Sequence, residues 1–307
     1  MHRLKPKARQ KGMAAIIAIL IATLAASTAA FIVWQQSLWV RQLENVSERS
    51  KIDQLAKYAI DLARNRIKKD SHPASDSTFE WEEPISTTID EITVNAKITD
   101  AQSRFNINSL VQTTQPGVPP IINEDALKAF ERLLRRLKLD EKLADNVVNW
   151  IQDSQGNADM DYINLNPPYR TGQRKFVDVA ELTRVKGFTE PAMHTILPYV
   201  TALRGDAPVN INTASKELLA ALFDDESIAT QIIGKQGSSP IESIQDIQLP
   251  TNPGSTNTCN GCYDVKSNYF ILKIQAKGGR LESGYEVLIN RGGGQWPSVE
   301  WQKEIVQ

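Results

Sequence analysis

Residues 13–40 read MAAIIAILIATLAASTAAFIVWQQSLWV and contain no charged side chain. The most apolar part, from Met13 to Trp34, would extend about 33 Å as an α-helix, which is enough to cross the hydrocarbon core of a bilayer. Residues 1–12 precede it with five basic side chains and no acidic one. Because basic flanks stay in the cytoplasm, we expect the chain beyond about residue 41 to lie outside it.

The apolar run continues into an amphipathic segment. Over residues 43–67, apolar side chains recur at helical spacing, so the pattern predicts a single helix of about 55 residues. A secretory signal is the alternative, with a cleavage site at residues 25–27 or 27–29. The apolar run extends past both sites through residues 31–33, which favours a retained anchor. A helix that is apolar first and amphipathic second suits a subunit that assembles into a filament.

The composition is that of a globular protein. The 307 residues are 41% apolar and 23% charged, and this length allows one large or two ordinary domains. The formal net charge of −1 argues against a protein built mainly to bind nucleic acid. Two cysteines and three histidines exclude a four-thiolate metal site and leave little material for a histidine-rich one.

Strand patterns lie on both sides of the middle of the chain. Apolar and polar residues alternate in 92–99, and again in 270–276 and 285–289 around the turn at 277–280. This pattern predicts a half-buried strand followed, much later, by a hairpin. Residues 71–84 predict a loop.

The middle, about residues 110–250, is predicted to be helical. The signals are apolar stripes at 127–137, at 143–151 (ended by Gly156) and at 179–185 (ended by Gly187), a start at Thr189-Glu190-Pro191, a cap at Thr213 and a start at Ser239-Pro240. The predicted fold class is therefore α+β, with a long N-terminal helix and a large all-α insertion in an α/β core.

The segment from Lys11 to Leu20, KGMAAIIAIL, resembles a type IV prepilin-type cleavage site, which has a short basic leader ending in glycine. The resemblance implies cleavage between Gly12 and Met13 by a prepilin peptidase on the cytoplasmic side, with N-methylation of Met13. Those families usually carry glutamate at the fifth mature position, where this chain has Ile17.

A short motif occurs twice in the chain. Residues 105–109 read FNINS and residues 209–213 read VNINT, with asparagines that suit turn and N-cap positions. Together with Asp100-Ala101 upstream, residues 148–151 and residues 176–187, these motifs resemble the minor pseudopilin K family of type II secretion systems. The absence of glutamate at the fifth mature position is itself a feature of that family.

The resemblance covers nearly the whole chain. It implies a single-pass protein of the bacterial inner membrane with a periplasmic, pilin-like body. The missing carboxylate at Ile17 and the bulk of the helical insertion predict a position at the tip of the pseudopilus. Its implied partners are other minor pseudopilins, the major pseudopilin, the inner-membrane assembly platform and the prepilin peptidase. The implied divisions are a leader (1–12), a transmembrane half-helix (13–40), an amphipathic half-helix (41–70), a first pilin-like part (71–109), an α-helical insertion (110–250) and C-terminal strands (251–307).

Cys259 and Cys262 have the CxxC spacing, for which zinc binding, redox catalysis, free thiols and a structural disulfide are alternatives. In an oxidising envelope we expect a disulfide that closes a tight loop.

Two oxygen-rich loops are candidates for calcium, which prefers carboxylate and carbonyl oxygens. Asp153, Asp159 and Asp161 lie in the first loop, and Asp264 closes the second, residues 255–264. Neither loop matches the EF-hand pattern, and solvated acidic loops are the alternative. Pseudopilins often bind calcium in such loops, so the resemblance implies Ca²⁺ more strongly than the spacing does.

Two other functions compete with the secretion hypothesis. Residues 209–215 also look like the opening of a DNA-binding helix-hairpin-helix unit, which would suit an envelope DNA-binding or DNA-uptake factor, and a type IV pilus tip subunit is the other alternative. Lys216 and Lys235 are offset by nearby acidic residues, which disfavours phosphate binding. The sequence has no G-x-S-x-G, H-E-x-x-H or P-loop motif, and we expect no enzymatic activity.

Overall fold

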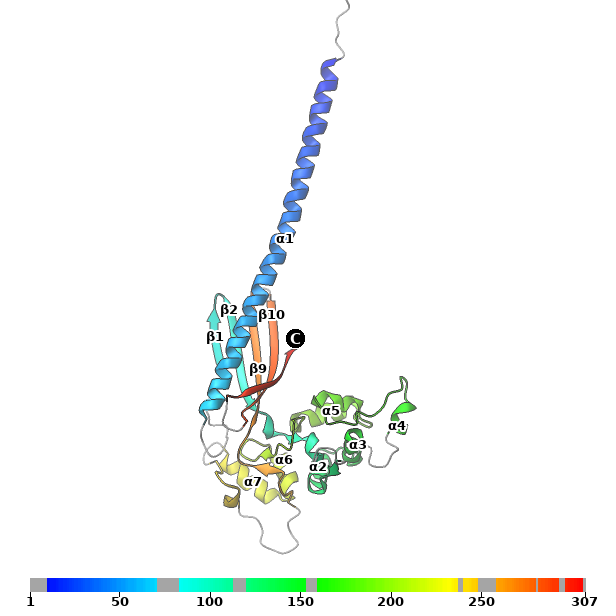
Figure 1. Ribbon diagram of the computed structural model, residues 1–307, viewed down its shortest axis with the longest axis vertical. Helices are drawn as coiled ribbons and strands as arrows, with labels where there is room; N and C mark the ends of the chain where they lie inside the picture. Colours follow the sequence, from blue (N-terminus) through cyan, green and yellow to red (C-terminus); the bar gives the residue numbers. More distant parts are fainter. Residues whose placement is uncertain are drawn as a thin grey trace, which may run out of the picture.

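A computed structural model of the chain describes residues 10–70, 83–112, 120–152, 159–236, 240–247, 258–279, 281–292 and 296–305. Its longest element is α1, an unbroken helix from Gln10 to Lys69. In Figure 1 the first half of α1 extends far from the rest of the molecule, which is gathered around and beyond its second half. Within the described residues, one helix is long and apolar enough to cross a membrane by length and composition, and it is α1. The long N-terminal helix predicted from the sequence is confirmed.

The second half of α1 packs on a five-stranded antiparallel sheet in the order β1-β2-β9-β10-β11. The strands are β1 (Ile85–Ile89), β2 (Ile92–Asp100), β9 (Tyr269–Gly278), β10 (Leu281–Asn290) and β11 (Ser298–Ile305).

Alternate apolar residues of the three central strands form the face that packs on α1. In register, Ala96 lies beside Ile274, and Ile274 lies beside Tyr285. They bury one side of α1, made by Ile52, Ala56, Ala59, Ala63 and Ile67. Alanines on this side leave room for the helix to approach the sheet closely. The alternation read in the sequence is therefore the alternation of a buried and an exposed sheet face.

A helical body, which we define as residues 101–265, is inserted between β2 and β9. Its α-helices are α2 (Glu124–Arg136), α3 (Lys142–Ile151), α4 (Met160–Ile163), α5 (Glu190–Ile196), α6 (Lys216–Phe223) and α7 (Glu226–Lys235). Its 3₁₀ helices are η1 (Ala101–Ser103), η2 (Ile107–Leu110), η3 (Val179–Arg184), η4 (Leu197–Tyr199) and η5 (Ile244–Asp246).

Short strand pairs cross-link the helical body. They join β3 (Phe105–Asn106) to β6 (Val200–Thr201), β4 (Val111–Gln112) to β5 (Ile121–Ile122), and β7 (Val209–Asn210) to β8 (Tyr263–Asp264). One buried apolar core runs through the body from Phe105 to Val265. In Figure 1 the body lies beyond the end of the sheet that is away from the start of α1, with α4 farthest to one side. The mixed helix-and-sheet class that the sequence predicted is confirmed.

Two helix-capping predictions are wrong. Thr213 does not cap α6: the N-cap is Ser215, whose hydroxyl accepts a hydrogen bond from the Leu218 N–H. Thr213 lies two residues before this N-cap, and its hydroxyl donates instead to Asp100 at 2.6 Å. Pro240 does not open a helix either, and the last helical turn is η5, which follows Ser243.

The predicted helix at 179–185 is a 3₁₀ helix. Its buried and half-buried apolar residues Val179, Leu182 and Val185 recur every three positions, which is the 3₁₀ period. Gly187 follows with φ +89°, the left-handed conformation expected of a glycine after a helix end. Gly156 lies outside the described residues.

The edge strands β1 and β11 and helix α7 are among the elements that the sequence patterns above do not predict. The edge strands β1 and β11 expose most of their residues, so neither shows a clean alternation. Helix α7 follows α6 directly, and its N-cap Asp225 accepts from the N–H groups of Ser227 and Ile228. An aspartate followed by a helix-forming run was available as a signal for α7.

Candidate functional site

The first half of α1 is the candidate assembly surface. Its apolar side chains, from Met13 to Val46, are exposed, and Ile17 is 52% exposed. A Cβ at Gly12 would have no atom within 4 Å, so the predicted cleavage point between Gly12 and Met13 lies on an uncovered stretch of helix. The leader residues 1–9 lie outside the described residues. An apolar helix surface of this length needs a bilayer or other helices to cover it.

Polar contacts hold the second half of α1 against the sheet. The Tyr285 hydroxyl donates to the Asp53 carboxylate, and Arg49 forms an ion pair with Glu304 of β11 at 2.7 Å. Burial, together with the hydrogen bond to Asp53, raises the pKa of Tyr285 to about 12.

A buried ion pair fixes the lower end of α1. Arg291 contacts Asp70 at 2.8 Å, and the two side chains are 11% and 3% exposed. Arg291 also donates to the Ser267 carbonyl, and its guanidinium lies over the Phe270 ring. The same arginine therefore connects the helix end to the start of β9.

Asp100 forms the junction between the sheet and the helical body. Its carboxylate accepts hydrogen bonds from the Gln102 N–H (2.7 Å), the Asn210 amide (2.8 Å) and the hydroxyls of Thr213 and Ser267 (both 2.6 Å). Burial raises the pKa of the Asp100 carboxyl, although all four hydrogen bonds act to lower it. The donors come from the start of the body, from its second half and from the segment that returns to the sheet, so one carboxylate ties three parts of the chain together.

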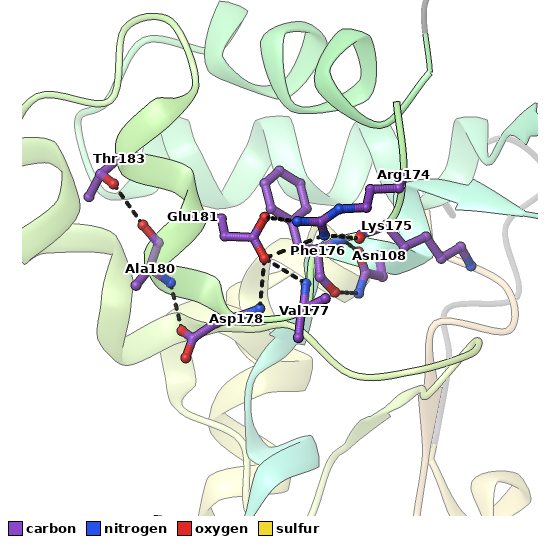
Figure 2. Close-up of polar contacts among 9 residues, drawn as sticks. All are labelled: Asn108, Arg174, Lys175, Phe176, Val177, Asp178, Ala180, Glu181 and Thr183. Atoms are coloured by element: carbon purple, nitrogen blue, oxygen red, sulfur yellow. Dashed lines mark hydrogen bonds and ion pairs between the residues drawn. The ribbon is translucent and has the colours of Figure 1, made fainter. Parts of the chain in front are cut away.

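The repeated motif seen in the sequence marks two similar structural units. In the first, the Asn108 amide donates to the carbonyls of Phe176 and Leu203, and its oxygen accepts from the Phe176 N–H. Figure 2 shows Asn108 beside Phe176, joined by these bonds. The parallel pair β3–β6 begins this unit.

In the second unit Asn212 repeats the pattern. Its amide donates to the carbonyls of Ile241 and, at 3.5 Å, Val265, and its oxygen accepts from the Ile241 N–H. The parallel pair β7–β8 begins this unit. Asn106 and Asn210 each accept from the N–H two residues on, as expected for turn and cap positions. Both also bond to segments distant in sequence, Asn106 to Leu203 and Gly205 and Asn210 to Asp100 and Ser267. Asn108 and Asn212 likewise bridge distant backbone segments.

The predicted calcium residues have partners of other kinds. Asp159 accepts from the N–H and hydroxyl of Thr171 at 2.9 and 2.8 Å, and these bonds lower its pKa. Asp161 forms an ion pair with Lys186 at 2.9 Å. Asp264, in β8, accepts from the Val265 N–H at 2.7 Å. Asp153 lies outside the described residues, and in the part that is described no three carboxylates, thiols or imidazoles gather into a group.

The structure pairs Cys259 with Cys262 as a disulfide. Both side chains are buried in the core of the helical body. The Cys259 N–H donates to the Leu222 carbonyl at the end of α6, so the CxxC loop is held against that helix.

Comparison with known proteins decides between the alternatives. Family models described as protein K of the type II secretion system match residues 103–205 and 209–257. The first match contains the first asparagine unit, and the second contains Asn210, Asn212 and Ile241 of the second unit. The type II secretion system protein K of Pseudomonas aeruginosa is 30% identical over 285 residues, covering 85% of this chain and 83% of that protein. The chain belongs to the type II secretion system protein K family.

Further relatives of the protein K family agree. The protein K of Pectobacterium carotovorum is 27% identical and covers 96% of this chain and 97% of its own length. Among solved structures, a chain of the GspK–GspI–GspJ complex from enterotoxigenic Escherichia coli has the same fold, with a TM-score of 0.72 at 21% identity over 87% of this chain and 100% of that chain.

Protein K membership makes this chain a minor pseudopilin of type II secretion, a protein-transport machinery. The family consists of structural pseudopilins, and neither a DNA-binding factor nor a type IV pilus subunit is supported by its relatives. The segment that resembled a helix-hairpin-helix opening, residues 209–215, instead packs inside the body, with Asn210 and Asn212 buried.

Proposed function

We propose that this chain occupies the tip of the pseudopilus, where it caps and initiates the filament that supports export of folded proteins across the outer membrane. The observation that carries the proposal is the position of the helical body, which lies beyond the sheet at the end away from the start of α1 and extends to one side (Figure 1). In a shaft of stacked α1 helices the heads repeat closely, and such a body would collide with the next subunit. At the end of a filament it has free space.

Ile17 supports the same position. A glutamate there would neutralise the N-terminal amine of a neighbouring subunit inside the apolar filament core, where an unpaired charge is costly. Ile17 offers that amine no partner, and a first subunit needs none.

The partners follow from this placement. Because the fold neighbour was solved as a GspK–GspI–GspJ complex, we assign other minor pseudopilins as the direct partners. The major pseudopilin, the inner-membrane assembly platform and the prepilin peptidase would be met during assembly. The N-terminus faces the cytoplasm, the body lies in the periplasm, and the protein acts by assembly and not by catalysis.

Imaging of overproduced pseudopili tests the tip position. A gold-binding tag in an exposed part of the helical body should place gold at one end of each filament. The same tag on the major pseudopilin is the control and should line the shaft. Gold distributed along the shaft for this chain would overturn the proposal.

We further propose that calcium binds beside Asp159. Its Oδ1 accepts both Thr171 hydrogen bonds, and the other carboxylate oxygen suits a hard cation. When bound, the ion would supply a fixed positive charge that cross-links this loop. Chelation should lower the melting temperature, and Ca²⁺ but not Mg²⁺ should restore it. Asp159→Asn keeps the acceptor for Thr171 and should shrink the response, whereas an unchanged melting temperature on chelation would count against a bound ion.

A further inference from the structure

A cleft of about 490 Å³ lies on the part of the helical body that carries α3 and η3. Trp150 and Tyr169 give it aromatic walls, and Arg170, Arg174 and Arg184 give it a basic rim. Neither membership of the protein K family nor the tip position assigns a role to this cleft.

One of the three arginines is already neutralised. Arg174 forms an ion pair with Glu181 at 2.8 Å and donates to the Lys175 carbonyl. Glu181 also accepts from the N–H groups of Val177 and Asp178. Figure 2 shows these contacts converging on the Glu181 carboxylate. The negative charge of Glu181 is therefore committed within its own loop.

The other two arginines have no such partner. Within the described residues, the side chains of Arg170 and Arg184 make no hydrogen bond or ion pair, and both residues are exposed. The positive charge of Arg170 helps to lower the pKa of the nearby Asp159, whose Oδ1 accepts from Thr171, but among the described residues no ion pair joins the two side chains. The rim therefore carries two positive charges that a ligand can neutralise.

Trp150 supplies a donor in the wall of the cleft. The residue is 4% exposed, and in the part of the chain that the structure describes its indole N–H has no acceptor. Gly172 lies against this edge of the ring, because a Cβ there would come within 2.7 Å of the indole nitrogen. A buried N–H without an acceptor is unfavourable, so a ligand carbonyl or carboxylate oxygen would gain by meeting it.

We infer that this cleft binds an acidic peptide segment of a protein partner. A carboxylate lies between Arg170 and Arg184, a neighbouring oxygen accepts from the Trp150 indole, and an apolar side chain covers the Tyr169 ring. Charge complementarity selects the acidic residue, and the aromatic walls favour a peptide over an inorganic anion. The inference does not depend on the tip position, since it follows from the cleft alone.

The test uses the full chain in detergent and two peptides with an uncharged fluorophore on the N-terminal amine, Asp-Phe-Asp-Leu-NH₂ and its neutral isostere Asn-Phe-Asn-Leu-NH₂. Fluorescence anisotropy should show binding of the acidic peptide, weakened by salt, and little binding of the isostere. Arg170→Gln and Arg184→Gln should each weaken binding about fivefold or more. Arg204→Gln removes the same charge from a residue that is 88% exposed at its side chain and outside the cleft, and it should leave affinity unchanged.

Trp150→Phe tests the indole donor. It removes the N–H but keeps an aromatic ring to stack on Phe176, so peptide binding should weaken in a protein that still melts cooperatively. The inference is overturned if both peptides bind equally, if neither binds at millimolar concentration, if Arg204→Gln weakens binding as much as the cleft variants, or if inorganic phosphate binds as tightly as the acidic peptide.

Discussion

At the scale of single residues, Asp100 determines how the helical body is joined to the sheet. It is 7% exposed, and within the part of the chain that the structure describes its carboxylate meets four neutral donors and no cationic side chain. A buried charge satisfied by neutral groups is tolerated when each lone pair is used. Burial raises the pKa of this carboxyl although the hydrogen bonds act to lower it, so desolvation of the charged form offsets part of what the hydrogen bonds contribute.

Asp100→Ala should destabilise the protein by about 2–4 kcal/mol, because it removes the acceptor for several buried donors at once. Asp100→Asn should cost less, since the hydroxyls of Thr213 and Ser267 can rotate to accept from the new amide. Chemical denaturation measures both. Asp206→Ala, at a side chain that is 54% exposed, is the control and should change stability little. Equal losses for Asp100→Ala and Asp206→Ala would contradict the role assigned to Asp100.

The raised pKa of Tyr285 predicts that the thermal stability of the protein falls at alkaline pH. Its pKa is about 12 in the folded chain and about 10 in an unfolded one. A raised pKa favours folding below the unfolded value, and the stabilisation is lost as the pH rises through the folded value. Melting temperature should therefore fall between pH 10 and about 12. Tyr285→Phe should flatten this fall, and a variant with an unchanged profile would show that the Asp53 contact is not responsible.

Some roles of the four asparagines could be predicted from the sequence, and others could not. The repeated motif predicted turn and cap positions, and Asn106 and Asn210 fill them. The bridging roles of Asn108 and Asn212 could not be predicted, because their partners lie 68 and 29 residues away along the chain. The role of Asp100 at the junction could not be predicted either, because its hydrogen-bond donors come together only in the folded chain.

At the scale of elements, a helix or strand could be predicted from the sequence where one of its faces is buried, because burial imposes a periodic pattern of apolar residues. The central strands β2, β9 and β10 have one buried face, and their alternation was read correctly. The edge strand β11 buries almost nothing, so its sequence SVEWQKEI contains no periodic signal. Helix α1 was predictable because both its membrane-like half and its packed half have strong apolar patterns.

Ile17→Glu belongs to this scale, because it changes the assembly surface of α1. The new carboxylate could neutralise the amine of an adjacent subunit, so the variant should enter internal positions of the filament more often. Gold labelling along overproduced pseudopili measures this, with Ile17→Gln as the uncharged control. If the glutamate and glutamine variants distribute alike, charge at this position does not select the place of a subunit.

At the scale of the whole molecule, the mass of the purified chain reports its processing. Cleavage between Gly12 and Met13 predicts a mature protein that begins at Met13 and carries one added methyl group. Gly12→Leu, which places a bulky side chain at the scissile bond, should retain the leader. A chain that begins after Ser27 or Ala29 would show instead that the apolar segment is a removed signal.

The junction also determines how the molecule transmits load. Strands β2 and β9 are adjacent and antiparallel, with Asp100 opposite Phe270, and both connect to the helical body at the same end of the sheet. A tensile force on the body along the strand axis therefore stretches both connections together, and the hydrogen bonds that anchor each strand in the sheet resist as a set in shear. A compressive force drives the sheet along α1, which Arg49 and Arg291 brace at two levels. The molecule is thus built as a stiff strut, able to carry thrust from its helix to its far end without unzipping strand by strand.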